Sequence, residues 1–213
     1  MATDESEHDD ALQRWLKANW PALVAGVVIG LLALGGWRYW NYRQAQQAQA
    51  ASLQYSKLLN QLGNKDFKSS TQLADRLQSR YGGTPYAAQA NLALAGYLAD
   101  RGDYVKAASR LHWVVQNGGD HDLRRLARLR EARALWGAKK PDQALKLLQT
   151  DQQNGPYLGL FQLLKGDILA SQHKPERARE AYELALQNLP QGAPEHQLAQ
   201  QKLNDLPAGS KSS

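Results

Sequence analysis

The sequence contains no cysteine, and only two phenylalanines and one methionine, in 213 residues. The lack of cysteine excludes disulfide frameworks, zinc sites built on thiolates and cysteine nucleophiles. Residues that favour strands are also scarce, whereas leucine and alanine supply most of the 43% hydrophobic fraction. Because this composition favours helices, we expect an all-α protein.

The sequence also lacks the residue patterns of an active site. No G-x-S-x-G, phosphate-binding glycine-rich loop or nucleotide fingerprint is present. The histidines are scattered, and none lies at helical spacing from a second histidine or a pair of carboxylates, as a metal site would require. We therefore predict a protein that is not an enzyme and uses no metal or cofactor. The five histidines are His8, His112, His121, His173 and His196.

Charged residues are absent from one stretch of 20 residues, ANWPALVAGVVIGLLALGGW at positions 18–37. A helix of this length rises about 30 Å, which matches the hydrocarbon core of a bilayer. We predict one transmembrane helix over residues 18–40. Aromatic residues flank it on both sides, as is typical of membrane interfaces: Trp15, Trp20, Trp37, Tyr39, Trp40 and Tyr42.

The tail at residues 1–17 is acidic, with five Asp or Glu residues against Arg14 and Lys17. A cleaved signal peptide would begin with basic residues, so we predict a retained anchor. Arg14 and Lys17 are balanced by Arg38 and Arg43 beyond the apolar run, and charge therefore leaves the orientation open. We expect the tail in the cytoplasm, since a short inner tail with an exported domain is the commoner arrangement.

Small residues recur every four positions within the apolar run, at Ala22, Gly26 and Gly30. Such a ridge allows a second transmembrane helix to pack closely. We interpret it as a packing site for a membrane partner, and the alternative is a face that simply contacts lipid.

The rest of the chain has a helical repeat. No helix breaker occurs between the apolar run and Gly63, which predicts one helix that continues into the following domain. From there to Leu206, apolar-periodic segments alternate with short breaks. We predict a tetratricopeptide-like α-solenoid of about four helix pairs over residues 41–206, with a terminal helix over Glu195–Leu206 and a disordered tail at 207–213.

The repeat signature is clearest between residues 157 and 190. Small residues at two of its positions let antiparallel helices approach, and its aromatic residue is expected to fill the groove to the neighbouring repeat. The spacing of the second small position is 37 residues and then 34, which predicts one long turn between repeats. A degenerate repeat is expected at 48–83. The signature residues are Ala95, Ala107, Ala132, Ala144, Gly166, Ala178, Tyr182, Ala185 and Pro190.

Basic residues are concentrated in one segment, HDLRRLARLREAR at 121–133, in a chain of net charge +6. They point in several directions around a helix, so they do not form the continuous stripe that nucleic-acid binding favours. We interpret Arg124, Arg125 and Arg128 as a candidate surface for an acidic protein or a lipid. The alternative is a solvated face with a few ion pairs.

Several segments together resemble the YfgM family of ancillary subunits of the bacterial Sec translocon. They are the acidic tail, the run ALVAGVVIG, the membrane exit GWRYWN at 36–41, the Ala-Ser-Leu-x-Tyr stretch at 51–55 and the repeats. The resemblance covers nearly the whole chain, and the membrane exit is its most specific part.

The resemblance implies a single-pass inner-membrane protein of Gram-negative bacteria with a periplasmic repeat domain. It implies partners in the SecYEG channel and a membrane-anchored periplasmic chaperone, and a role in passing newly exported, unfolded chains to chaperones. It carries over no catalytic residue. The alternative function is a periplasmic scaffold for an outer-membrane or cell-wall assembly complex, which shares the plan of an anchored repeat domain.

Overall fold

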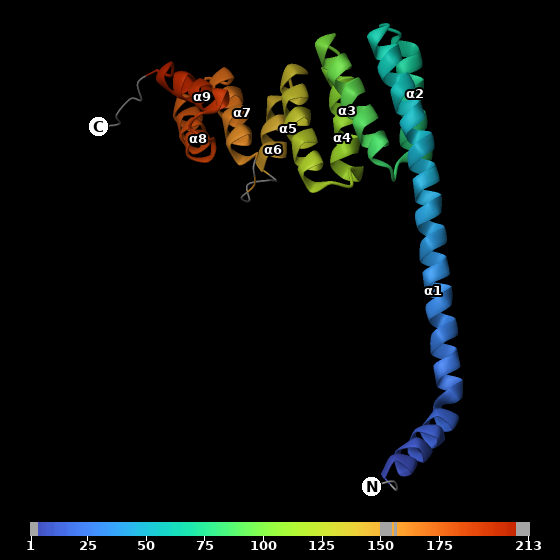
Figure 1. Cartoon of the computed structure of the whole chain (residues 1–213). Helices are drawn as coiled ribbons and strands as arrows, with labels where there is room; N and C mark the ends of the chain where they lie inside the picture. Colours follow the sequence, from blue (N-terminus) through green and yellow to red (C-terminus); the bar gives the residue numbers. More distant parts are fainter. Residues whose placement is uncertain (1–3, 150–154, 156, 208–213) are drawn as a thin grey trace. The chain divides into compact units, whose positions relative to one another are not determined.

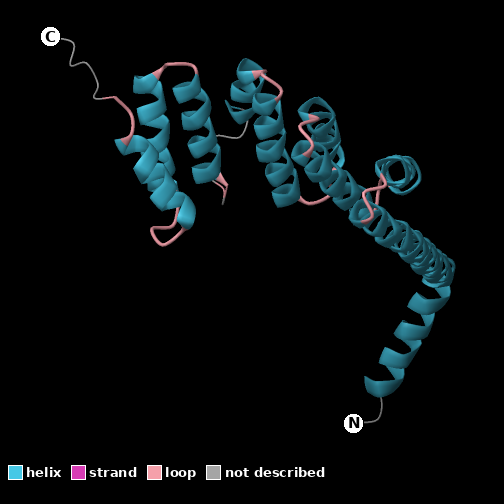
Figure 2. Cartoon of the chain, turned by 90° about the horizontal axis from the view of Figure 1, so that it is seen from above, coloured by secondary structure: helices cyan, strands magenta, loops and turns pink. Residues whose placement is uncertain are grey.

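The computed structural model of the chain describes residues 4–149, 155 and 157–207. Across these residues it contains helices and turns and no strand, which confirms the expected all-α class (Figures 1 and 2). The helices are α1 (Asp4–Gly63), α2 (Phe67–Tyr81), α3 (Pro85–Asp100), α4 (Tyr104–Asn117), α5 (His121–Gly137), α6 (Pro141–Gln149), α7 (Leu158–Ser171), α8 (Pro175–Asn188) and α9 (Pro194–Asn204).

The chain divides into two compact units, residues 1–49 and 50–213. The first unit lies within α1, and its large apolar side chains that the structure describes between Trp20 and Tyr42 are exposed, as for Leu32 at 71%. This part of α1 is long and apolar enough to cross a membrane. As expected, the helix continues without a break to Gly63.

The second unit is a row of helix pairs that lie side by side (Figure 1). The pairs are the end of α1 with α2, then α3 with α4, α5 with α6 and α7 with α8, and α9 follows them. Ala51 and Leu58 of α1 pack in the same core cluster as Ala74 and Leu77 of α2. The unit is therefore an α-solenoid of four helix pairs, including the degenerate first one.

The turn inside each pair has the same design. One residue has a positive φ, and the second helix begins two residues later. Successive turn residues are separated by 102 − 65 = 37, 139 − 102 = 37 and 173 − 139 = 34 positions, which gives the repeat length directly. Only one of the four is glycine, although a positive φ favours it. The residues are Lys65 (φ 59°), Gly102 (φ 78°), Lys139 (φ 61°) and His173 (φ 56°).

The 37-residue spacing does not result from the turn between repeats that it contains, because only residues 118–120 separate α4 from α5, so that explanation was wrong. The start of α4 precedes the start of α5 by 121 − 104 = 17 residues, and α6 precedes α7 by 158 − 141 = 17 residues. The difference lies in the first helix of the pair, because α5 has 17 residues and α7 has 14. Hydrophobic periodicity could not distinguish a longer helix from a longer turn, because it locates the ends of a helix only to within a few residues.

The alanines of the repeat signature are buried between helices, whereas Pro190 is exposed after α8. Gly166 is also buried, beneath the ring of Tyr182. Tyr182 thus lies over the first helix of its own pair. The repeat signature had instead led us to expect it in the groove to the neighbouring repeat. Small residues allow this close approach of α7 and α8.

The terminal helix α9 packs on the last pair through Ala199, which is fully buried. Lys202 Nζ lies 2.5 Å from Asp167 Oδ1 on α7, and the same oxygen accepts a hydrogen bond from the Tyr182 hydroxyl at 2.8 Å. These contacts join α7, α8 and α9. Residues 208–213, most of the tail predicted to be disordered, lie outside the described part of the chain.

Candidate protein-binding groove

A groove opens between α3 and α5, and we call it the α3–α5 groove. One leucine and three small residues line it along α3, at the helical spacing of positions 92, 95, 96 and 99. Gly96 leaves it open, because no atom lies within 4 Å of the point where a Cβ would stand. The volume is about 190 Å³, and the lining residues are Leu92, Ala95, Gly96, Ala99, Tyr104, Leu111, Arg130, Arg133 and Ala134.

A second hollow of about 710 Å³ adjoins the first, since Tyr104 and Arg133 line both. It is bounded by the ends of α5 and α7 and by the start of α6. Its other lining residues are Trp136, Gly137, Lys139, Pro141, Ser171 and Gln172. The two hollows therefore form one continuous surface across three helix pairs.

Tyr104 lies where the two hollows meet. It is the first residue of α4, directly after Asp103, whose side chain accepts a hydrogen bond from the Lys106 backbone N–H. Its ring lies against Gly137 of the next repeat, so closely that a Cβ there would come within 2.8 Å of Cδ1. The ring remains 37% exposed and offers an apolar edge to a ligand.

The charge of this surface is positive. Arg130 and Arg133 are exposed, and in the described part of the chain neither forms an ion pair. The residues lining the two hollows include no Asp or Glu. The surface thus combines an apolar floor with uncompensated guanidinium groups.

The predicted arginine surface is not brought together as one patch. Arg124 donates hydrogen bonds from Nη1 to the carbonyl oxygens of Gly118 and Gly119, at 2.5 and 3.4 Å, and so holds the turn before α5. Arg125 is half-buried with its guanidinium group against Gly155. Burial raises the pKa of the Glu131 carboxyl group, and Arg128 lies close enough to oppose part of this rise. A partner role for these three arginines stays a prediction.

Ala22, Gly26 and Gly30 are exposed on α1. No atom lies within 4 Å of a Cβ built on either glycine, so the ridge is open. Its role in packing against another transmembrane helix stays a prediction.

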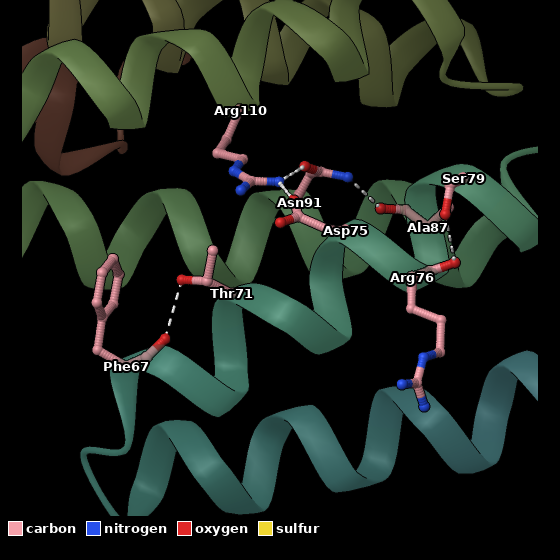
Figure 3. Close-up of polar contacts among 8 residues, drawn as sticks. All are labelled: Phe67, Thr71, Asp75, Arg76, Ser79, Ala87, Asn91 and Arg110. Carbon is pink, nitrogen blue, oxygen red and sulfur yellow. Dashed lines mark hydrogen bonds and ion pairs between the residues drawn. The ribbon is translucent and has the colours of Figure 1, made fainter.

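A second polar cluster links α2, α3 and α4 (Figure 3). Arg110 Nη1 lies 2.6 Å from Asp75 Oδ1 and 3.5 Å from the side-chain oxygen of Asn91. Asn91 is fully buried and donates to the carbonyl oxygen of Ala87 at 2.9 Å. Since these groups satisfy one another, the cluster stabilises the stack of helices.

Glu131 is the most buried acidic side chain on α5, at 8% exposure. Burial raises the pKa of its carboxyl group, and His112, with Nδ1 3.0 Å from Glu131 Oε1, opposes the rise. One histidine and one glutamate are too few to hold a metal ion. Within the described residues no group of three His, Cys, Asp or Glu side chains is placed to hold an ion.

Sequence reasoning found the arginine-rich helix but not the residues that form the groove. The sequence shows that Arg130 and Arg133 are three residues apart. It also shows that four residues of α3 share one helix face: Leu92, Ala95, Gly96 and Ala99. Which face of each helix turns toward the groove depends on how the pairs stack, and Tyr104 lacked any signal besides its place at a helix start.

The comparisons with known proteins cover nearly the whole chain. A family model described as a tetratricopeptide repeat-like domain matches residues 13–208. A curated protein of Escherichia coli (strain K12), "Ancillary SecYEG translocon subunit", is 33% identical over 190 residues, which cover 88% of this chain and 91% of the relative. Relatives with the same name from Neisseria gonorrhoeae and Haemophilus influenzae are 30% and 28% identical, and each match covers 95% of this chain.

Both results fall on the apolar helix and the helix pairs together, not on the repeats alone. A match of this extent cannot come from a generic helical scaffold that shares only the repeat pattern. The match over residues 13–208 and the relatives that share the name "Ancillary SecYEG translocon subunit" show that the chain belongs to the YfgM family.

Proposed function

We propose that this chain is a membrane-anchored protein-binding scaffold of the Sec translocon, which helps to transfer exported proteins to periplasmic chaperones. The observation that carries the proposal is the similarity, over at least 88% of the chain, to relatives named as ancillary subunits of the SecYEG translocon. The similarity includes the anchor as well as the repeats.

The proposed location is the bacterial inner membrane, crossed once, with the N-terminus in the cytoplasm and the repeat domain in the periplasm. The exposed apolar face of α1 supports a membrane anchor, and the family membership supports the orientation that charge left open. The proposed partners are translocon subunits, a membrane-anchored periplasmic chaperone and exported unfolded chains.

The proposed mechanism needs no catalysis. The anchor keeps the repeat domain beside the channel, which raises the effective concentration of any partner that the domain binds. The surface of the α3–α5 groove and its neighbour supports a binding role, because it is apolar, cationic and open to solvent. We propose no enzyme activity for this chain.

Photocrosslinking in native membranes tests the association with the channel. A photoreactive residue replaces Ile29, which lies about 60° around the helix from Gly26, and a matched control replaces Val28, on the opposite face from the ridge. Both side chains are exposed on α1. We expect SecYEG adducts from position 29 and few from position 28. Adducts with lipid alone from both positions would contradict the proposal.

A swapped anchor separates this function from the alternative. Replacing residues 18–40 with an unrelated transmembrane helix should abolish co-purification with SecYEG if the anchor docks on the channel. An envelope scaffold for outer-membrane or cell-wall assembly would instead keep its partners after the swap and lose them when the repeat domain is removed.

A further inference from the structure

We propose that the α3–α5 groove binds an acidic segment of a partner protein. One apolar side chain of that segment lies over Gly96, and carboxylates beside it pair with Arg130 and Arg133. The inference deepens the proposed function, on which it rests only for the premise that the repeat domain binds proteins.

The size and lining of the groove favour a single side chain. Its volume of about 190 Å³ is below the roughly 300 Å³ at which small-molecule sites begin. Apart from the two arginines and Tyr104, the lining side chains are aliphatic or absent. Burying an aliphatic side chain of the partner against them releases water from both apolar surfaces.

The positive charges beside the groove favour a segment with negatively charged side chains. Arg130 and Arg133 lie on one face of α5, three residues apart, and both line the groove. A guanidinium group pairs with a carboxylate through two parallel hydrogen bonds, which gives direction as well as affinity. Arg110 and Arg124, by contrast, are already engaged by Asp75 and by backbone carbonyl oxygens.

The surface beyond Arg133 gives the segment a path. Tyr104 and Trp136 offer apolar contacts there, and Lys139 adds a third positive charge to those of Arg130 and Arg133. An extended chain that enters over Gly96 therefore meets alternating apolar and cationic groups. Since successive side chains of an extended chain point to opposite faces, this pattern fits a segment in which pairs of leucines and pairs of glutamates follow one another, so that each face carries both.

The test uses the full chain in nanodiscs of phosphatidylcholine, a lipid without net charge. The probe is a fluorescein-labelled synthetic peptide in which pairs of leucines alternate with pairs of glutamates, and its matched control has glutamine in place of every glutamate. Fluorescence anisotropy measures both dissociation constants. We expect the glutamine peptide to bind at least about tenfold more weakly, and the acidic peptide to lose affinity as salt rises.

Two variants test the site itself. Gly96→Leu fills the groove, so it should weaken binding of the acidic peptide about tenfold or more without lowering the thermal midpoint, because a Cβ at this position meets no neighbouring residue within 4 Å. The double variant Arg130→Gln, Arg133→Gln should lose most of the preference for the acidic peptide, since Lys139 is then the one basic residue among the described residues that line the two hollows. Arg177→Gln, an exposed arginine on α8, is the matched control and should bind the acidic peptide like the wild type.

Equal binding of the two peptides by the wild type, or unchanged binding by Gly96→Leu, would overturn the inference. So would a wild-type dimer that Gly96→Leu converts to a monomer without any peptide binding, since a second copy would then fill the groove. Loss of translocon crosslinks at position 29 with the peptide still bound would overturn the proposed function and leave this inference standing.

Discussion

The ring of Tyr182 lies directly on Gly166, with no room for a Cβ between α7 and α8. Gly166 is therefore a packing requirement of the last helix pair. Both residues are buried, and the Tyr182 hydroxyl reaches past the glycine to Asp167. At this point the two helices can approach so closely because residue 166 has no side chain.

Gly166→Ala should destabilise the full chain by about 1–3 kcal/mol, because the added methyl group would force the Tyr182 ring out of its place. Urea unfolding of the detergent-solubilised protein, followed by circular dichroism, measures the change. Gly96→Ala is the matched control: it also adds a methyl group within a helix, but into open space, and should stabilise by about 0.5–1 kcal/mol. Equal effects of the two substitutions would contradict the packing argument.

The positive-φ turns predict opposite effects of glycine and alanine. Gly102→Ala should cost about 1–2 kcal/mol of unfolding free energy, since a Cβ is strained at φ 78°. His173→Gly should stabilise by about 0.5–1 kcal/mol, because it relieves the strain at φ 56° while adding flexibility to the unfolded chain. The same urea titration checks both, and a loss of stability in His173→Gly would count against the assigned turn geometry.

The environment of Tyr182 also predicts that the stability of the fold decreases at alkaline pH. Burial, and then the hydrogen bond to Asp167, raise the pKa of its hydroxyl above the ordinary value near 10. A raised pKa means that the unfolded chain loses the proton first. The contribution to stability is thus complete below pH about 10 and declines as the pH rises beyond it.

Tyr182→Phe should therefore cost about 1–3 kcal/mol at neutral pH, through the lost hydrogen bond to a carboxylate, and should be less sensitive to pH above about 10. Unfolding titrations of both proteins between neutral and alkaline pH measure the gap in stability. A gap that stays constant over this range would show that Tyr182 does not carry the dependence.

Substitutions of Arg124 and Arg130 should have different effects on stability, although both residues lie on α5. Arg124→Ala should destabilise by about 1 kcal/mol, because its guanidinium group no longer donates to the Gly118 carbonyl oxygen at the turn before α5. Arg130→Ala, which removes no hydrogen bond within the described residues, should change stability by less than about 0.5 kcal/mol. Thermal unfolding midpoints of the two variants distinguish a structural arginine from a surface one.

Removal of residues 1–42 should leave a soluble helical protein, since the helix pairs pack around Ala51 and Leu58 and later residues. Circular dichroism and gel filtration without detergent test this expectation. A spectrum rich in strand would contradict the fold, and aggregation would show that the repeat unit needs the earlier part of α1.

The sequence by itself determined the local features of this protein. The uncharged run at 18–37, the continuous helix to Gly63 and the pairing of later helices follow from hydrophobicity, helix propensity and breakers, which act over a few residues. The small positions of the repeat were also visible, because close helix packing allows few residue types there.

Only the tertiary structure decided which helix faces meet. In the folded chain Tyr182 lies on Gly166 of its own pair, and the three additional residues of the longer repeat lie in α5. Arg124 donates hydrogen bonds to the turn before α5, whereas Arg130 and Arg133 lie beside the open groove at Gly96. The physical reason is that such outcomes depend on how each pair stacks on the next. That stacking balances many contacts between residues distant in sequence, and no single spacing along the chain records the result.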